Sequence, residues 1–154
     1  MRAVPGESWR SSAKGTTAVV RAARVTGSLI SVFYSTTLPK SPGSAAQARL
    51  FLDQLRAQLD HDVFENARLL LSELVANAVE HVREEGDLEV RITLGDGVLR
   101  VEVLDPGPGF VPPRRTPGSD RGWGLHFTDR LASRWAVDHD GRARVWFELS
   151  LTES

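Results

Sequence analysis

The amino-acid sequence predicts an α+β fold, a two-layer sandwich with one mixed, mainly antiparallel sheet covered on one face by helices. Residues 88–104 form two runs of alternating apolar and polar side chains around Gly95-Asp96-Gly97, which predicts a β-hairpin. Residues 45–59 and 63–82 carry apolar side chains at helical spacing, and residues 145–151 alternate again. Strands joined by a hairpin, with helices grouped before and after them, favour one sheet covered by one helical layer.

The N-terminal part of the chain predicts a tail followed by a strand. Residues 1–27 are rich in Arg, Ser, Gly and Ala without a sustained period, so we expect a mobile tail with room for a short helix around residues 18–25. Residues 28–154 are then the single domain. Residues 28–38 are rich in β-branched and aromatic side chains and stop at Pro39, which predicts a strand.

Two helices are expected between this strand and the hairpin. Pro42-Gly43-Ser44 supplies a turn and an N-cap for a first helix over 45–59. Asp60-His61-Asp62 interrupts the apolar pattern and offers a new N-cap. The central helix then runs to about Val82, before the polar residues 84–87 end it.

The segment after the hairpin predicts a functional loop. Residues 105–120 are sixteen residues with five prolines and three glycines, which is long and irregular for a connection in a small domain. Residues 124–134 have helical spacing. A turn at 138–141 then leads into the final strand over 145–151.

Composition excludes several classes of function. The 154 residues include 19 basic and 20 acidic side chains, so the net charge of -1 gives no electrostatic reason to expect direct binding of nucleic acid or an anionic membrane. The absence of cysteine excludes disulfides and thiol catalysis. No run approaches the roughly 18 apolar residues of a membrane span. We therefore expect a soluble, cytoplasmic protein.

One carboxylate and one amide stand together in the central helix. Glu73 and Asn77 are four residues apart, so a helix projects them from the same face. On its own, such a pair also fits the solvated edge of an amphipathic helix. Its meaning depends on the other motifs of the chain.

Two glycine-containing motifs follow in the second half of the chain. Asp105 ends a strand before Pro106-Gly107-Pro108-Gly109, where a carboxylate can accept a hydrogen bond from an exocyclic amine and glycine lets the backbone approach a flat ring. Arg121-Gly122-Trp123-Gly124-Leu125 stands at a predicted helix N-terminus, which favours a phosphate. A capped turn and a flexible helix entry would explain each motif separately. The three motifs in this order favour a nucleotide site.

These motifs resemble those of the GHKL, or Bergerat-fold, ATPases, and within them the small bacterial anti-sigma-factor serine kinases. SELVANAVEH at 72–81 resembles the N box, DPGPGF at 105–110 the first glycine box, and RGWGL at 121–125 the second. VWFEL at 145–149 resembles the closing strand of the actinobacterial members. The resemblance covers about residues 28–151 and implies the Bergerat ATP-binding fold.

The resemblance implies a role for each matching residue. Glu73 would be the general base that polarises the attacking hydroxyl, and Asn77 would bind the Mg²⁺ that bridges the ATP phosphates. Asp105 would accept a hydrogen bond from the adenine amino group. The other matching residues would flank the base (Gly107 and Gly109) or cradle the phosphates (Gly122, Gly124 and Leu125, with Arg121 assisting). Two positions depart from the pattern, because Arg144 stands where related strands often begin with Thr and Trp123 is bulky.

The function implied is that of an ATP-dependent protein serine/threonine kinase that binds a sigma factor and phosphorylates an anti-anti-sigma (STAS-type) partner. Family members are commonly homodimers. An alternative is an ATP-gated partner-switch protein with little or no kinase activity, although the presence of Glu73 favours the kinase. The catalytic domain of a sensor histidine kinase is less favoured, because the sequence shows no dimerising helix with a phospho-accepting histidine.

Overall fold

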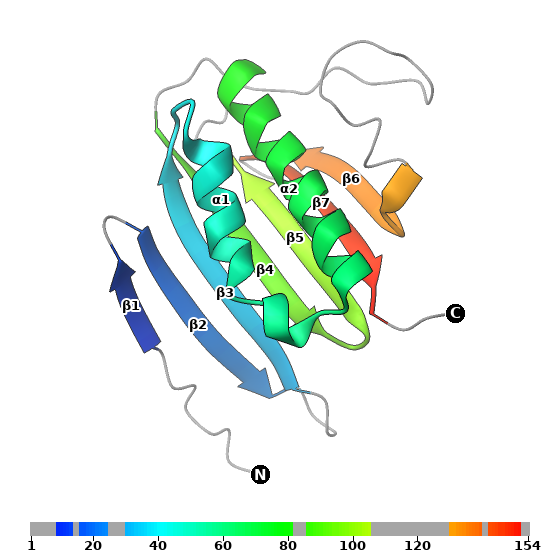
Figure 1. Cartoon of the computed structure of the whole chain (residues 1–154). Coiled ribbons are helices and arrows are strands. Elements are labelled where there is room, and N and C mark those ends of the chain that lie inside the picture. The colour runs from blue at the N-terminus through cyan, green and yellow to red at the C-terminus, as the bar shows by residue number, and fades with distance from the viewer. Residues whose placement is uncertain are drawn as a thin grey trace.

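One antiparallel sheet carries two helices on one of its faces in the computed structural model (Figure 1). The structure describes residues 9–13, 16–24, 30–81, 86–105, 130–139 and 142–151. Within these residues the sheet has seven strands in the order β1-β2-β3-β4-β5-β7-β6. The strands are β1 (Trp9–Ala13), β2 (Thr16–Arg24), β3 (Ile30–Pro39), β4 (Asp87–Gly95), β5 (Val98–Leu104), β6 (Arg134–His139) and β7 (Ala143–Ser150). The helices are α1 (Ser44–Asp53), a 3₁₀ turn η1 (Arg56–Gln58) and α2 (His61–His81).

The predicted fold class is confirmed: a single sheet is covered on one face by helices (Figure 1). Each pair of neighbouring strands in the described part of the chain is antiparallel, so the parallel component of the expected mixed sheet is not seen there. Neither described helix is both long and apolar enough to cross a bilayer.

The core lies between the helices and the sheet. Tyr34, Ile92, Val101 and Phe147 are paired in register across β3, β4, β5 and β7, and all four are buried. Alternate strand residues point to opposite faces, so this row and its neighbours form the apolar side of the sheet. On the helical side of the core, α2 contributes seven buried apolar side chains: Phe64, Ala67, Leu70, Leu71, Leu74, Val75 and Ala78.

The hairpin and the central helix occur where the sequence predicts them. Asp96 and Gly97 have φ angles of 55° and 71°, so the turn between β4 and β5 has the left-handed backbone that tight hairpins require. The helix α2 starts at His61, and its first turn is closed by a 2.9 Å hydrogen bond from the Phe64 N–H to the Asp60 carbonyl.

The first helix is shorter than the predicted 45–59. It ends at Asp53, and the chain continues in tighter bonds such as Leu55 N–H to the Leu52 carbonyl, 2.9 Å, before η1. This tightening still buries Leu55 and Leu59, which explains why the apolar spacing looked helical to the end. Ser44 is the first helical residue and not the predicted N-cap, because its hydroxyl donates back to the Pro39 carbonyl.

The N-terminal segment corrects another prediction. A short helix was expected around residues 18–25 within a mobile tail, but residues 9–13 and 16–24 form strands β1 and β2. The register of β2 on β3 runs from Val19 opposite Ser35 to Arg24 opposite Ile30. The segment Thr16–Arg24 is rich in β-branched residues, which favour strands, and β3 supplies its backbone partners. That residues 28–154 form the domain stays a prediction.

The segment before the final strand also differs from the prediction. Of the expected helix over 124–134, residues 124–129 lie outside the described residues, and helical backbone at 130–131 ends before β6 begins at Arg134. The strand β6 pairs with β7 from Arg134 opposite Glu148 to His139 opposite Ala143. The strand therefore occupies part of the turn expected at 138–141, while the final strand itself is confirmed as β7.

Candidate functional site

The C-terminal half of α2 and the C-terminal ends of β3 and β5 lie at the same end of the sheet (Figure 1). The predicted pair Glu73 and Asn77 belongs to this half of the helix, and Asp105 directly follows β5. The fold therefore brings three of the predicted site residues to one end of the molecule.

Asn77 is a buried amide at the margin of the apolar face of α2. The residue retains only 8% of its accessible surface, and its Nδ2 has no hydrogen-bond partner in the described part of the structure. A buried donor without a partner costs free energy comparable to a lost hydrogen bond, roughly 1–3 kcal/mol. Such a group is expected where a ligand supplies the acceptor.

Glu73 lies one turn before Asn77 on the same side of the helix and is half-buried. Its carboxylate makes no hydrogen bond or ion pair with any residue that the structure describes. A carboxylate in this position keeps its full capacity to accept a proton or a hydrogen bond from an incoming hydroxyl group.

Asp105 is held through both its side chain and its backbone. Its Oδ1 lies 3.3 Å from the Lys40 Nζ, and the side chain is only 4% exposed. Its N–H donates to the Ala143 carbonyl at 2.8 Å, and its own carbonyl accepts from the Arg142 Nε at 3.4 Å. The ends of β3 and β5 and the start of β7 are therefore joined at this carboxylate.

Lys40 and Arg142 were not predicted from the sequence. Each stands next to a strand end, and neither belongs to a recognisable motif. The available signal for Lys40 is its position directly after a predicted strand, but only the sheet order shows that this strand, β3, and the strand before Asp105, β5, both pair with β4.

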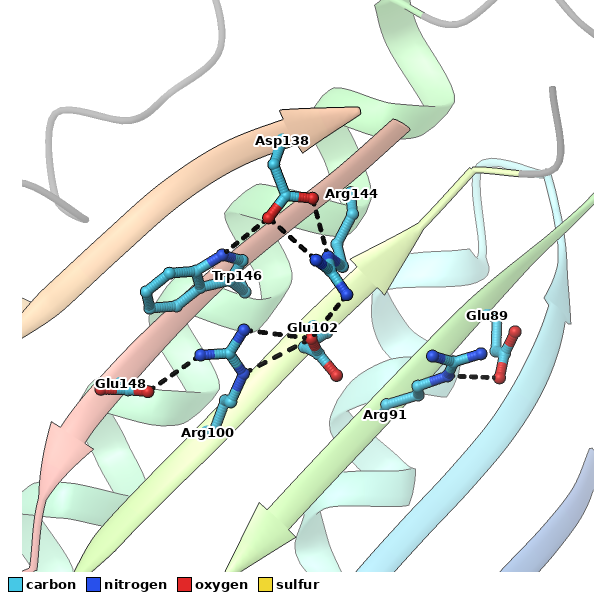
Figure 2. Close-up of polar contacts among 8 residues, drawn as sticks. All are labelled: Glu89, Arg91, Arg100, Glu102, Asp138, Arg144, Trp146 and Glu148. Carbon is cyan, nitrogen blue, oxygen red and sulfur yellow. Dashed lines mark hydrogen bonds and ion pairs between the residues drawn. The ribbon is translucent and has the colours of Figure 1, made fainter. Parts of the chain in front are cut away.

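The opposite face of the sheet carries the side chain of Arg144, the position where related strands often begin with Thr. Figure 2 shows Arg144 between Asp138 and Glu102, on the face that the helices leave open. Its Nε donates to Asp138 Oδ1 at 2.8 Å. The Arg144 side chain therefore forms ion pairs with Asp138 and Glu102 on this open face.

Arg142 links Asp105 to the same open face. Both of its terminal nitrogens lie 3.1 Å from Glu89 Oε2, and Arg91 Nε lies 2.7 Å from Glu89 Oε1. Burial raises the pKa of Glu89, but hydrogen bonds and charges from Arg91 and Arg142 outweigh it, so that the pKa lies below its ordinary value. The ionised Glu89 thus fixes the arginine that holds the Asp105 carbonyl.

The donor set fits Mg²⁺ only together with a nucleotide. Across the described residues no group of three or more His, Asp and Glu side chains could hold a metal ion. Magnesium commonly takes one or two protein ligands and completes its shell with waters and phosphate oxygens. The amide of Asn77 meets that limited requirement, because its Oδ1 would be enough as a protein ligand when the phosphates supply others.

The remaining predicted site residues lie outside the described residues: Gly107, Gly109, Arg121, Gly122, Gly124 and Leu125. The same holds for Trp123 and for most of the loop expected over 105–120. Their roles stay predictions.

Comparisons with known proteins agree with this fold. The model of the histidine kinase-like ATPase domain family matches residues 38–149, a range that includes Glu73, Asn77 and Asp105. Among solved structures, the crystal structure of the RsbU and RsbW domains of Rv1364c from Mycobacterium tuberculosis superposes with a TM-score of 0.60 at 24% identity over 86% of this chain. The match covers 35% of that longer chain. No curated protein matches the sequence.

Proposed function

The chain belongs to the histidine kinase-like ATPase domain family, and on that premise we propose that it is an ATP-binding anti-sigma regulatory factor with protein serine/threonine kinase activity. Its proposed substrate is a serine or threonine hydroxyl of an anti-anti-sigma partner. Support comes from the order of the three motifs that contain Glu73, Asp105 and Gly122. The likeness in fold to a chain with RsbU and RsbW domains is in keeping with this proposal.

One observation carries the proposal. The buried Asn77 amide has a donor without a hydrogen-bond partner among the described residues, and it lies one helical turn from the Glu73 carboxylate. A purely structural amide in a core is expected to be satisfied by its neighbours. An amide beside a carboxylate without protein partners is expected where phosphate oxygens and a hydroxyl group bind.

Each side chain has a defined part in the proposed reaction. Asp105 accepts a hydrogen bond from the exocyclic amine of adenine, which orients the nucleotide. Glu73 accepts the proton of the substrate hydroxyl as its oxygen forms a bond to the γ-phosphorus and the bond to the bridging oxygen of ADP breaks. Asn77 would hold Mg²⁺, which supplies neutralisation of the phosphate charge when bound.

The partners proposed are a sigma factor and a STAS-type anti-anti-sigma protein, with a homodimer as the proposed assembly. These assignments rest on the resemblance of the three motifs to the anti-sigma-factor kinases. Size measurement of the chain alone tests the homodimer. Titration with a candidate sigma factor, in the presence and absence of ATP, tests the regulatory interaction.

Calorimetric titration with ATP, in the presence and absence of Mg²⁺, tests the nucleotide site directly. We expect magnesium-dependent binding that Asp105→Asn weakens strongly, because the replaced oxygen no longer accepts from the exocyclic amine. Asp96→Asn is the matched control, since Asp96 lies in the exposed turn between β4 and β5 and Asn also tolerates its positive φ. Its affinity for ATP should equal that of the wild type.

The outcomes separate the kinase from its alternative. ATP binding followed by transfer of phosphate to a serine-containing partner supports the kinase. ATP binding that controls sigma-factor affinity without any transfer supports the partner-switch protein, in which nucleotide acts only as a ligand. No ATP binding overturns both.

A further inference from the structure

We propose that Arg142 is a positioning residue for adenine recognition, which holds the main chain of Asp105 from the open face of the sheet while Glu89 holds Arg142 itself. The inference rests on the proposed function, in which Asp105 accepts a hydrogen bond from the exocyclic amine of adenine. It adds a residue that lies outside every motif of the sequence and that acts on the base only through another residue.

Asp105 and Arg142 meet where the pairing of β5 with β7 ends. The register of these strands runs as far as Leu104 opposite Arg144, so Asp105 lies one residue beyond it. The Asp105 N–H donates to the Ala143 carbonyl at 2.8 Å, and the Asp105 carbonyl accepts from Arg142 Nε at 3.4 Å. Residues 142 and 143 therefore hold the main chain of Asp105 at both its donor and its acceptor.

The Asp105 carboxylate and the Arg142 guanidinium lie on opposite faces of the sheet. Asp105 is two residues beyond Val103, which belongs to the core, so the alternation of β5 directs its side chain to the helical side. Glu89 is two residues before Arg91, which Figure 2 shows on the open face, and the Arg142 guanidinium contacts Glu89 there. The proposed nucleotide site is on the helical side, so Arg142 can affect the base only through Asp105.

Glu89 fixes the Arg142 guanidinium. Both terminal nitrogens of Arg142 lie 3.1 Å from Glu89 Oε2. The other oxygen of this carboxylate accepts from Arg91 Nε at 2.7 Å and from the Ser35 hydroxyl at 3.3 Å, which ties it to β3 as well as β4. Although burial raises the pKa of Glu89, the hydrogen bonds and charges of Arg91 and Arg142 bring it below its ordinary value. Glu89 is therefore charged at neutral pH and anchors Arg142 to the sheet.

Loss of this anchor should impair base recognition more than binding of the phosphates. A hydrogen bond weakens steeply when its distance or angle departs from the favoured values, and the position of the carboxylate follows the main chain of Asp105. Two carboxylate oxygens offer about four lone-pair sites, so Asp105 can accept from the base while it keeps its ion pair with Lys40. A displaced main chain would move all of these sites relative to adenine.

The experiment compares ADP with inosine diphosphate, which carries a carbonyl oxygen in place of the exocyclic amine. Calorimetry on the full chain with Mg²⁺ gives the ratio of the two affinities for the wild type and each variant. We expect the wild type to prefer ADP and Arg142→Met to lose about three- to tenfold of that preference, the effect of one ordinary hydrogen bond. Affinity for inosine diphosphate should change much less.

Arg91→Met is the matched control. Arg91 pairs with the same Glu89 carboxylate, and its side chain is 31% exposed against 38% for Arg142. Among the described residues Arg91 forms no hydrogen bond with Asp105. Both variants should lower the free energy of unfolding in urea, but only Arg142→Met should lower the preference for ADP. Equal losses of preference in the two variants would assign the effect to the ion pairs of the open face in general and overturn the inference.

Arg142→Lys covers the case in which Arg142→Met fails to fold. Lysine keeps a positive charge beside Glu89, but its aliphatic stem has no donor at the place of Nε. We expect this variant to lose the preference for ADP to a similar extent. Wild-type preference in Arg142→Lys would show that charge beside Glu89 suffices, which overturns the role of the contact between Nε and the Asp105 carbonyl.

A double variant tests whether Arg142 acts through Asp105. In Arg142→Met/Asp105→Asn the ratio of affinities should equal that of Asp105→Asn alone, because the carboxylate that Arg142 positions is already gone. Losses that add independently would overturn the inference. Equal losses of affinity for ADP and inosine diphosphate in Arg142→Met would make Arg142 a structural residue and overturn it as well.

Failure of the proposed function and failure of the inference give different results. If the wild type binds both nucleotides equally, the adenine role of Asp105 fails and takes the inference with it. If the wild type binds neither, the proposed nucleotide site itself is overturned. A wild-type preference for ADP that Arg142→Met retains in full removes Arg142 alone.

Discussion

Arg100 lies over the ring of Trp146, with its Cζ 3.9 Å from the ring centroid, on the sheet face that the helices leave open (Figure 2). The same guanidinium reaches Glu148 at 2.9 Å and Glu102 at 3.3 Å. Arg144 approaches Glu102 from the other side at 3.6 Å. The open face is therefore a connected network of ion pairs around one aromatic ring, in which each charge has more than one partner.

Replacement of Arg100 by methionine should destabilise the protein. The change removes two ion pairs and the contact with the Trp146 ring, so we expect a loss of about 1–3 kcal/mol in the free energy of unfolding, measured with urea. Arg134→Met is the matched control, because Arg134 is 73% exposed and lies 3.7 Å from Glu148. Exposed pairs of this kind contribute less than about 1 kcal/mol. Equal losses in both variants would contradict the network.

The Asp138 carboxylate should make stability depend on pH. A hydrogen bond from Arg144 outweighs partial burial and, with smaller contributions from Trp146 and Arg100, lowers the pKa of Asp138 below its ordinary value of 3.8. The unfolded chain therefore binds the proton first as the pH falls, so the stabilisation is complete above about pH 5 and is lost as the pH falls through the lower, folded pKa.

Urea unfolding of the wild type and of Asp138→Asn, from pH 7 to about pH 3, checks this expectation. The difference in the free energy of unfolding between the two proteins should be largest near neutral pH and should shrink in acid. A difference that stays constant over this range would show that Asp138 contributes through its shape and not through its charge.

Gly95→Ala should be destabilising. A Cβ at Gly95 would lie 3.0 Å from the Ser31 Cα and closer still to the Ser31 hydroxyl, and the backbone of β3 cannot move without disturbing the strand pairing. Overpacking of this kind typically costs about 1–3 kcal/mol. Gly43→Ala is the control, since its nearest neighbour would be Ser41 Oγ at 3.8 Å, an ordinary contact. Thermal unfolding of both variants should show a lowered midpoint for Gly95→Ala alone.

Glu73→Ala should retain nucleotide binding and lose phosphotransfer. Removal of a general base typically costs 10²–10⁴-fold in rate, roughly the size expected here. Single-turnover transfer of labelled phosphate to the partner measures the rate, and calorimetry on the same variant confirms that ATP still binds. Unchanged turnover would remove Glu73 from the mechanism.

Local patterns in the sequence are sufficient to predict the central helix and the hairpin. The spacing of apolar residues in α2 is regular over its whole length, and the turn at Asp96 and Gly97 uses residues suited to a positive φ. The pair Glu73 and Asn77 follows from the same periodicity. The part of the candidate site that lies on α2 and at the end of β5 is therefore predictable from the sequence.

Elements that depend on distant partners were not predictable in this way. The strand β6 is short, and Asp138 at its end is fixed by Arg144 on β7, a contact that no local period reveals. The ion pair between Lys40 and Asp105 depends on β3 and β5 lying on either side of β4, which is a property of the sheet order. The end of α1 at Asp53 depends on how Leu55 and Leu59 reach the core through a tighter turn.

The pairing of β2 with β3 changes what truncation would do to the chain. With β2 in place, β3 is an interior strand that pairs with β2 over residues 30–35 and with β4 over residues 32–39. A chain cut at residue 28 would expose one row of backbone donors and acceptors beside the apolar and aromatic side chains of β3. An open edge of this kind is a template for strand addition by another copy, and it would be longer than the five-residue edge strand β1 of the whole sheet.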